Sequence, residues 1–228
     1  MKKHHPGSGK KLPVAAFAYA EIKRRVLDNE FAPGAYFLEQ EIAEILAVSR
    51  TPVREALQKL QQEGLVEVVP RRGVRIVPIS GSDMQEIYVI LTGLEAAAAE
   101  LVARRGLSSN ERDSLTGAVT RMDQALDNDD LLAWARADED FHRYLVALTN
   151  NNRLITMVQM LWDQSHRARM TTLKLRPRPV KSNDDHRALI EAIGQGDAEL
   201  AGKIHSSHRR QSGAMLVALL EDLGLKQL

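Results

Sequence analysis

Four polar side chains occupy positions where the helical spacing of their neighbours predicts apolar ones. Asp138 and His142 lie four residues apart on one stripe of a segment that is otherwise apolar along that face. His186 and His208 hold the same kind of position in two later segments. Carboxylates and imidazoles are ligands for divalent cations, and residues four apart on a helix can bind one ion together. Gathered from three helices, these four side chains would form a site for Zn, Ni, Mn or Fe.

Simpler interpretations compete with this site. A single histidine on an apolar face is more often a hydrogen-bonded core residue or a surface residue than a ligand. An unpaired buried carboxylate would cost several kcal/mol, so Asp138 must either face solvent or have partners that neutralise it. Glu139 and His205 lie close to two of the four residues in the sequence and are competing candidates. The spacing alone leaves the ligand set open.

The candidate ligands fall within a long helical region. Beyond residue 82 the apolar residues recur with helical periodicity, no segment has the alternation of a strand, and the breaks are only a few residues long. Short connections favour antiparallel neighbours, which predicts an all-helical antiparallel bundle. The expected helices cover residues 82–105, 108–127, 130–148, 152–174, 182–194 and 197–222.

A cluster of Pro, Gly and Ser at residues 78–82 separates this bundle from the preceding part of the chain. We therefore expect a flexible tail over residues 1–13, one domain over residues 14–79 and a second over residues 80–228. The first 80 residues carry 13 Lys+Arg against 9 Asp+Glu, whereas the rest carry 18 against 21. A basic small domain attached to a slightly acidic larger one is typical of a polyanion-binding module.

The composition excludes several classes of protein. The 228 residues include no cysteine, which excludes disulfides, thiolate metal sites and cysteine nucleophiles. No apolar run approaches the roughly 18 residues that span a bilayer, and no apolar segment with a cleavage site follows the basic amino terminus. We expect a cytoplasmic protein with no membrane partner.

The amino-terminal domain has the pattern of a winged helix-turn-helix. Three helical patterns are followed by two β-branched runs that a basic turn separates. Pro52 suits the first turn of the third helix, because its missing N–H would have no intrahelical partner there. The whole chain is therefore expected to be mostly α-helical. The helical patterns cover residues 14–29, residues 38–46 and the segment around Pro52, and the β-branched runs cover residues 65–69 and 74–77.

Arg50 and Arg54 share a face of the third helix that differs from its apolar stripe. Two guanidinium groups near a helix N-terminus suit phosphates and the edges of guanine in a major groove. The basic turn Arg71-Arg72-Gly73 can lie along a DNA backbone or reach into a minor groove, where Gly allows a close approach. Two arginines alone are more often a solvated charged face, but the hairpin that follows them favours a recognition helix.

The segment of residues 33–77, above all its run SRTPVREAL, resembles the DNA-binding domain of the GntR family of bacterial transcription regulators, in particular the FadR subfamily. The resemblance extends over about residues 14–78. Gln40 departs from the family pattern, since it stands where some members carry a DNA-contacting arginine, although its amide can still form a hydrogen bond. The DNA contacts that the resemblance implies are Arg50, Thr51, Arg54, Arg71, Arg72 and Gly73.

Residues 82–225 resemble the FCD ligand-binding domain of the same subfamily, through the runs DEDFHRYL, DDHRALIEAI and GDAELAGKIHSSH. Many FCD domains bind a metal through one Asp and three His. These map onto Asp138, His142, His186 and His208. The resemblance therefore favours this set over Glu139 and His205.

Three nitrogen ligands and one oxygen ligand leave octahedral positions that a small carboxylate or hydroxy acid can enter as an effector. His166, Arg167 and Arg169 in the preceding helix are the candidate effector-binding residues, and we expect at least one of the arginines to face the cavity and pair with the acid.

The resemblance implies a ligand-responsive transcription regulator, and we expect this regulator to act as a repressor. One winged helix buries too little DNA surface for tight specific binding, so we expect a homodimer on a palindromic operator. Family members dimerise through the helical domain. A purely structural metal is one alternative. A metal-dependent enzyme is another, but no general base stands out, because Glu139 and Asp140 are turned partly away from the ligands, and we expect no catalysis.

Overall fold

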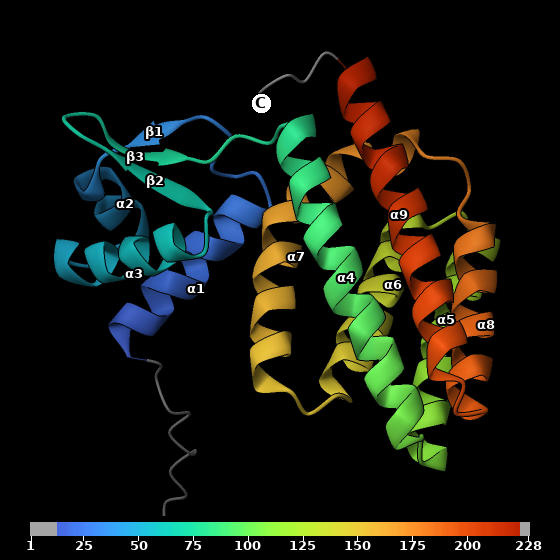
Figure 1. Ribbon diagram of the computed structural model, residues 1–228. Helices are drawn as coiled ribbons and strands as arrows, with labels where there is room; N and C mark the ends of the chain where they lie inside the picture. Colours follow the sequence, from blue (N-terminus) through green and yellow to red (C-terminus); the bar gives the residue numbers. More distant parts are fainter. Residues whose placement is uncertain (1–12, 224–228) are drawn as a thin grey trace, which may run out of the picture. The chain divides into compact units, whose positions relative to one another are not determined.

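The computed structural model describes residues 13–223. The chain divides into two compact units between Pro78 and Ile79, one residue before the expected boundary. Of the tail expected over residues 1–13, all but Pro13 lies outside the described residues. The helices and strands of both units are labelled in Figure 1.

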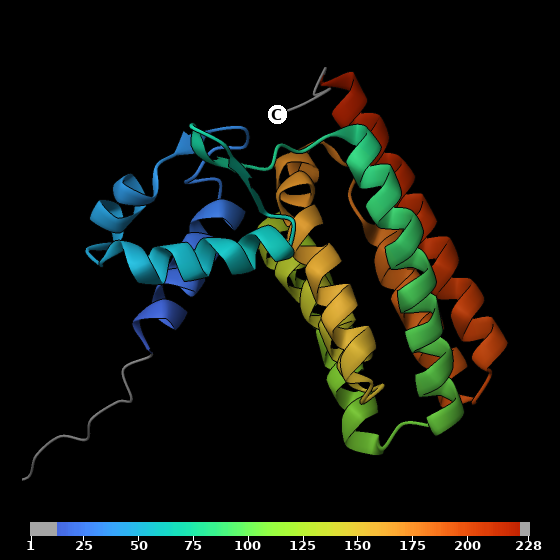
Figure 2. The same ribbon diagram turned by 60° about the vertical axis from the view of Figure 1, so that its left-hand side comes forward.

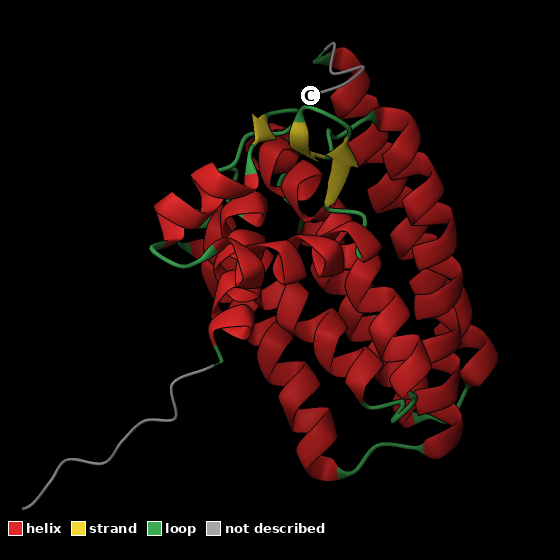
Figure 3. Ribbon diagram, turned by 90° about the vertical axis from the view of Figure 1, so that its left-hand side faces the viewer, coloured by secondary structure: helices red, strands yellow, loops and turns green. Residues whose placement is uncertain are grey.

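The first unit is a winged helix-turn-helix, in which three helices pack against a small antiparallel sheet (Figure 3). The strand order is β1-β3-β2, and Glu67 of β2 faces Arg75 of β3. The sequence predicts the β2–β3 hairpin but not β1, because two residues are too few to show an alternating pattern. The elements are α1 (Val14–Leu27), β1 (Tyr36–Phe37), α2 (Glu39–Leu46), α3 (Arg50–Gln62), β2 (Val66–Val69) and β3 (Gly73–Ile76).

The core of the first unit fixes the orientation of α3. Val53, Leu57 and Leu60, at helical spacing, are buried against the other helices and the sheet. Since these residues define the inner face of α3, Arg50 and Arg54 lie on its exposed side. The apolar stripe therefore determines which surface the arginines present.

The second unit is an all-helical bundle, and no strand occurs among its described residues. Its two longest helices, α4 and α9, run antiparallel side by side (Figures 1 and 2). The segment between α7 and α8 differs most from the helices expected from the sequence. A 3₁₀ turn follows α7, and α8 begins two residues earlier than expected. The elements are α4 (Gly81–Arg105), α5 (Ser109–Asp127), α6 (Leu131–Ala147), α7 (Asn152–Thr172), η1 (Leu173–Leu175), α8 (Val180–Gly194) and α9 (Ala198–Asp222).

Side-chain caps set the starts of several of these helices. Ser108 and Glu111 form a reciprocal capping box at the start of α5, which satisfies two N–H groups that would otherwise lack partners. Asp130 accepts a hydrogen bond from the N–H of Ala133 and so caps α6. Asn151 caps α7 in the same way. These caps fix where α6 and α7 begin, and thereby the rotational phase of the polar residues that they carry.

Helices α4 and α9 approach each other closely at two glycines of α9. A Cβ atom on Gly213 would lie 2.6 Å from Cδ1 of Tyr88, and one on Gly202 would lie 2.6 Å from a carboxylate oxygen of Glu100. Any side chain at these positions would force its neighbour to move. None of the described helices is both long and apolar enough to cross a membrane.

Candidate metal centre and nucleic-acid interface

The structure brings Asp138, His142, His186 and His208 together inside the second unit. Helix α6 carries the first two, α8 carries His186 and α9 carries His208, and all four side chains are buried. One ligand atom from each lies within 4.8 Å of the others. The Nε2 atoms of His142 and His186 are 3.2 Å apart, and Oδ1 of Asp138 lies 3.6 Å and 3.7 Å from them. The sequence spacing predicts that these four side chains lie on the inner faces of their helices, and all four are buried there.

These separations suit a divalent cation. Metal–ligand bonds of about 2.1 Å place neighbouring ligand atoms about 3.0–3.4 Å apart, so the atoms of Asp138, His142 and His186 need to move only slightly. Burial lowers the pKa of His186 and of His208, which keeps lone pairs available for a metal. Burial alone would raise the pKa of Asp138, but the adjacent imidazoles and Arg169 hold it well below its usual range. The candidate donors are thus one carboxylate and three imidazoles, of which those of His186 and His208 are kept neutral by burial.

A second buried carboxylate lies behind His142. Glu95 of α4 is fully buried, and its Oε2 lies 3.3 Å from Nδ1 of His142, off the ideal hydrogen-bond direction. The same oxygen is 2.8 Å from both Nε2 of His205 and Nε of Arg209, while Nε1 of Trp162 donates to Oε1. Burial opposes ionisation of Glu95, but Arg209 and the two histidines outweigh it and hold the pKa well below the ordinary value.

Glu95, His142 and His205 also lie close enough together to suggest a second cation site. Arg209 argues against it, because its guanidinium already neutralises the oxygen that a cation would need. Burial lowers the pKa of His205 to about 4, so His205 serves as a neutral hydrogen-bonding partner of Glu95. The group is a buried polar network that supports His142.

The remaining ligands also have carboxylate neighbours. Nδ1 of His208 lies 3.3 Å from Oδ2 of Asp185, which leaves the opposite ring nitrogen for the metal. Glu139, a competing candidate in the sequence, instead lies near Arg143 and His166. Burial would raise the pKa of Glu139, but His166 and the arginines around it lower that pKa to about 2. Glu139 is therefore part of the cavity wall and outside the four-ligand cluster.

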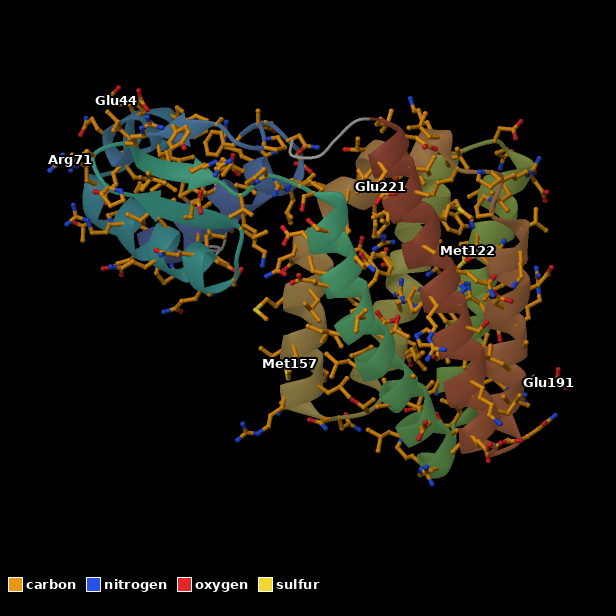
Figure 4. The ribbon with its side chains drawn as sticks, turned by 45° about the horizontal axis from the view of Figure 1, so that its top comes forward. Glu44, Arg71, Met122, Met157, Glu191 and Glu221 are labelled. Carbon is orange, nitrogen blue, oxygen red and sulfur yellow. The ribbon has the colours of Figure 1, made fainter. Side chains whose placement is uncertain are left out.

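The candidate DNA-binding residues gather on one side of the first unit. Arg50 and Arg54 are more than half exposed. Together with Gln40, Arg71 and Gly73 they line an open groove between α2, α3 and the wing. Figure 4 shows Arg71 at the outer edge of this unit. A groove with exposed guanidinium groups on a helix and on a hairpin suits a nucleic-acid backbone and groove edge.

The arginines of α3 have an acidic partner on α2. Nη2 and Nε of Arg54 donate to the carboxylate of Glu39 at 2.8 Å and 3.0 Å, and Arg50 reaches the same carboxylate at 3.5 Å. Gln40 donates to Glu44 at 2.8 Å. The guanidinium of Arg54 is thus held in a fixed orientation in the DNA-free chain.

Residues of the wing have local structural roles as well. Gly73 has a φ of +91°, and a Cβ atom there would clash with the carbonyl oxygen of Phe37, so β1 requires a glycine at this position. Arg71 also adopts a positive φ of 65°. Arg72 lies over the ring of Tyr36 and is absent from the groove lining. Thr51 is exposed at the start of α3.

Comparison with known proteins is consistent with both units. The family model for bacterial regulatory proteins of the gntR family matches residues 14–76, and the model for the FCD domain matches residues 86–211. The chain belongs to the GntR family and carries an FCD domain.

The regulator is similar in sequence to two known transcriptional regulators and in fold to one solved structure. It is 34% identical over 84% of its length to an uncharacterized HTH-type transcriptional regulator of Streptomyces ambofaciens, 80% of which is covered. It is 30% identical to a probable D-xylose utilization operon transcriptional repressor of Paenarthrobacter nicotinovorans, with coverage of 82% of this chain and 81% of the relative. The structure of McbR/YncC from E. coli has the same fold, with a TM-score of 0.77, 20% identity and coverage of 92% and 99%.

The GntR-family regulator positions two of its three candidate effector-binding residues beside the cluster of Asp138 and the three histidines. Arg169 donates to Oδ2 of Asp138 at 3.1 Å, and His166 lies 3.7 Å from Glu139. Both line an inner cavity of about 100 Å³ that Asp138 and His208 also line. Arg167 is buried and absent from the described lining of this cavity. Residues 166 and 169 share one face of α7, whereas residue 167 lies about 100° around the helix.

Two functional candidates of the regulator were missed in the sequence. Glu95 had a detectable signal, because it interrupts a buried stripe that contains Leu91, Ala98 and Val102 at helical spacing. Arg176 lies after η1, where no periodicity reveals which way a side chain points. Its cavity position is visible only in three dimensions.

Proposed function

We propose that this GntR-family regulator is a repressor whose affinity for DNA is controlled by a small organic acid at a divalent metal in the FCD domain. The observation that carries the proposal is the cluster of one carboxylate and three imidazoles beside a cavity with arginines in its wall. The Paenarthrobacter relative is named as a probable repressor, which supports repression as the direction of control.

Different residues of this chain would bind the metal and the organic acid. Asp138, His142, His186 and His208 would hold the metal, which would supply positive charge and free coordination positions to an anionic ligand. Arg169 and His166 border the same cavity and would pair with the acid or orient it. Asp138 and His208 in the wall are buried, and a low-dielectric surrounding strengthens the attraction between charges and an acid.

A homodimer on a two-fold symmetric operator is the second part of the proposal. Arg50, Arg54 and the wing span one half-site, and one such module buries too little DNA for tight specific binding. Two copies reading two half-sites would supply the missing affinity. The acid would act by binding unequally to the DNA-bound and DNA-free arrangements of the dimer, since a ligand with equal affinity for both shifts nothing.

The test uses an operator selected from random-sequence duplexes by repeated binding to the full chain. Fluorescence anisotropy then measures operator affinity for metal-loaded and chelated protein, with and without a panel of organic acids. We expect at least one acid to weaken operator binding only when metal is present. Acid effects that are indifferent to metal, or operator binding that no acid changes, would assign the metal a purely structural role. A selected sequence without two-fold symmetry would contradict the dimeric operator.

The metal ligands are tested separately from DNA binding. His186→Ala should lower the bound metal per chain, whereas His166→Ala, a histidine at the cavity wall outside the cluster, should leave it unchanged. Metal content is measured by mass spectrometry after loading and gel filtration. Equal metal content in the two variants would remove His186 from the ligand set.

A further inference from the structure

The inner cavity beside the metal ligands adjoins an outer cavity of about 330 Å³. Leu131, Pro177, Pro179 and Met215 give the outer cavity a largely apolar wall. Both cavities lie within the second unit, and a ligand that touches the metal centre can extend into the outer space. The residues that line both cavities are Trp134, Leu173, Arg176, Ser182, His208 and Ser212.

Arg176 is the basic side chain that the two cavities share. Its Nη2 and Nε donate to the hydroxyl of Thr172 at 2.8 Å and 3.2 Å. Within residues 13–223 it has no carboxylate at ion-pair distance. A hydroxyl satisfies hydrogen-bond donors but supplies no counter-charge, and the carboxylate of Asp138 attracts Arg176 only from beyond ion-pair distance.

The other basic side chains around the cavities are either paired with a carboxylate or, like Arg136 in the wall of the inner cavity, exposed to solvent. Arg169 pairs with Asp138 and Arg209 with Glu95. At the outer cavity, Lys181 pairs with Asp185, and Arg178 lies 3.6 Å from Asp129 and is half exposed. Burial, with Arg169 nearby, lowers the pKa of Arg176, so an anion placed against it would relieve an unfavourable charge.

We propose that Arg176 binds a second carboxylate of the effector, so that the ligand of this regulator is an organic diacid. This inference rests on the proposed function, in which the first carboxylate lies at the metal. The second carboxylate would accept two hydrogen bonds from the guanidinium fork. The chain between the carboxylates would lie against Trp134, whose indole N–H is already satisfied by Asn183 at 2.9 Å and therefore presents an apolar face.

Calorimetry on the zinc-loaded full chain tests the proposal with linear diacids from malonate to adipate and with the monoacids of the same chain lengths. In the wild type, we expect one diacid to bind at least about tenfold more tightly than its matched monoacid. Arg176→Gln should remove this preference and leave the monoacid within about twofold. Arg176→Lys keeps the charge without the fork and should retain part of the preference. Thermal unfolding of each variant establishes that it is folded.

Arg178→Gln is the matched control, because Arg178 lines the outer cavity two residues away but is half exposed and near Asp129. We expect it to change diacid binding by less than about twofold. Equal affinity of the wild type for diacids and monoacids, absence of binding by every diacid, or the same loss in both arginine variants would overturn the proposal.

The same protein samples separate this proposal from the proposed function. If a diacid binds with dependence on Arg176 but never changes operator affinity, the subsite stands and effector control of DNA binding fails. If a monoacid releases the operator as effectively as every diacid, control of DNA binding stands and the Arg176 subsite fails.

Discussion

Glu95 places one carboxylate oxygen 3.3 Å from Nδ1 of His142, whereas the other ring nitrogen, Nε2, faces His186 within the candidate metal site. A carboxylate in this place favours the tautomer that carries its proton on Nδ1, which leaves the Nε2 lone pair free to bind a metal. The oxygen itself is held by His205 and Arg209 of α9. The orientation of a ligand on α6 therefore depends on α4 and α9.

Glu95→Gln should weaken metal binding by about 10- to 100-fold, because an amide holds the imidazole less firmly and leaves Arg209 without its counter-charge. Competition with a chromophoric chelator measures the metal affinity. Glu86→Gln, an exposed change on the same helix, is the control and should have no effect. An affinity within twofold of wild type for Glu95→Gln would show that Glu95 only fills space beneath the site.

Arg54→Ala should lower affinity for the selected operator by roughly 1–3 kcal/mol and reduce discrimination against random DNA. Arg72→Ala should weaken binding to operator and random duplexes alike and flatten the dependence on salt, as expected for loss of a phosphate contact. Anisotropy titrations over a range of salt concentrations distinguish the two effects. If Arg54→Ala loses the same free energy on both duplexes, Arg54 reads no base.

Glu39→Gln should increase affinity for random DNA several-fold at low salt, because it removes a negative charge from the groove and releases Arg50 and Arg54. The operator-to-random ratio should fall, since the guanidinium of Arg54 is no longer held in one orientation. Glu41→Gln, on the same helix, is a control for charge alone. Unfolding free energy should change by less than about 1 kcal/mol, as for other exposed ion pairs. Identical DNA affinities for Glu39→Gln and Glu41→Gln would contradict a special role for Glu39.

Acid should destabilise the metal-free second unit. Burial lowers the pKa of His205 to about 4 and also lowers the pKa of His186 and His208. The unfolded chain takes up protons near the ordinary imidazole pKa of about 6.5, where the folded histidines remain neutral. Their contribution to stability is therefore complete above about pH 6.5 and is lost as the pH falls toward 4.

Tryptophan fluorescence follows this unit specifically, because both tryptophans of the chain, Trp134 and Trp162, lie in it. Urea unfolding in the presence of a chelator should show a midpoint that is constant above about pH 6.5 and falls as the pH drops toward 4. His205→Gln should reduce that dependence. A midpoint independent of pH across this range would mean that the buried histidines ionise without cost.

The sequence predicts the features that depend on helical phase. Asp138 and His142 share a face because they are four residues apart, and His186 and His208 interrupt apolar stripes that had to be buried. Glu95 and His205, 110 residues apart, meet only because α4 and α9 pack side by side. No periodicity specifies such a contact. The same limit applies to β1, whose pairing with β3 is a tertiary event, and to Arg176, which follows a short 3₁₀ turn.

The absence of a side chain at Gly213 has a consequence for which ligands can enter. Tyr88, whose ring would lie 2.6 Å from a Cβ atom there, also forms part of the inner cavity wall. A methyl group at position 213 would push the ring inward or force α4 away from α9. Residue 213 thus limits the width of the inner cavity, although it does not line the cavity itself. We expect relatives with larger residues at this position to bind only narrower ligands.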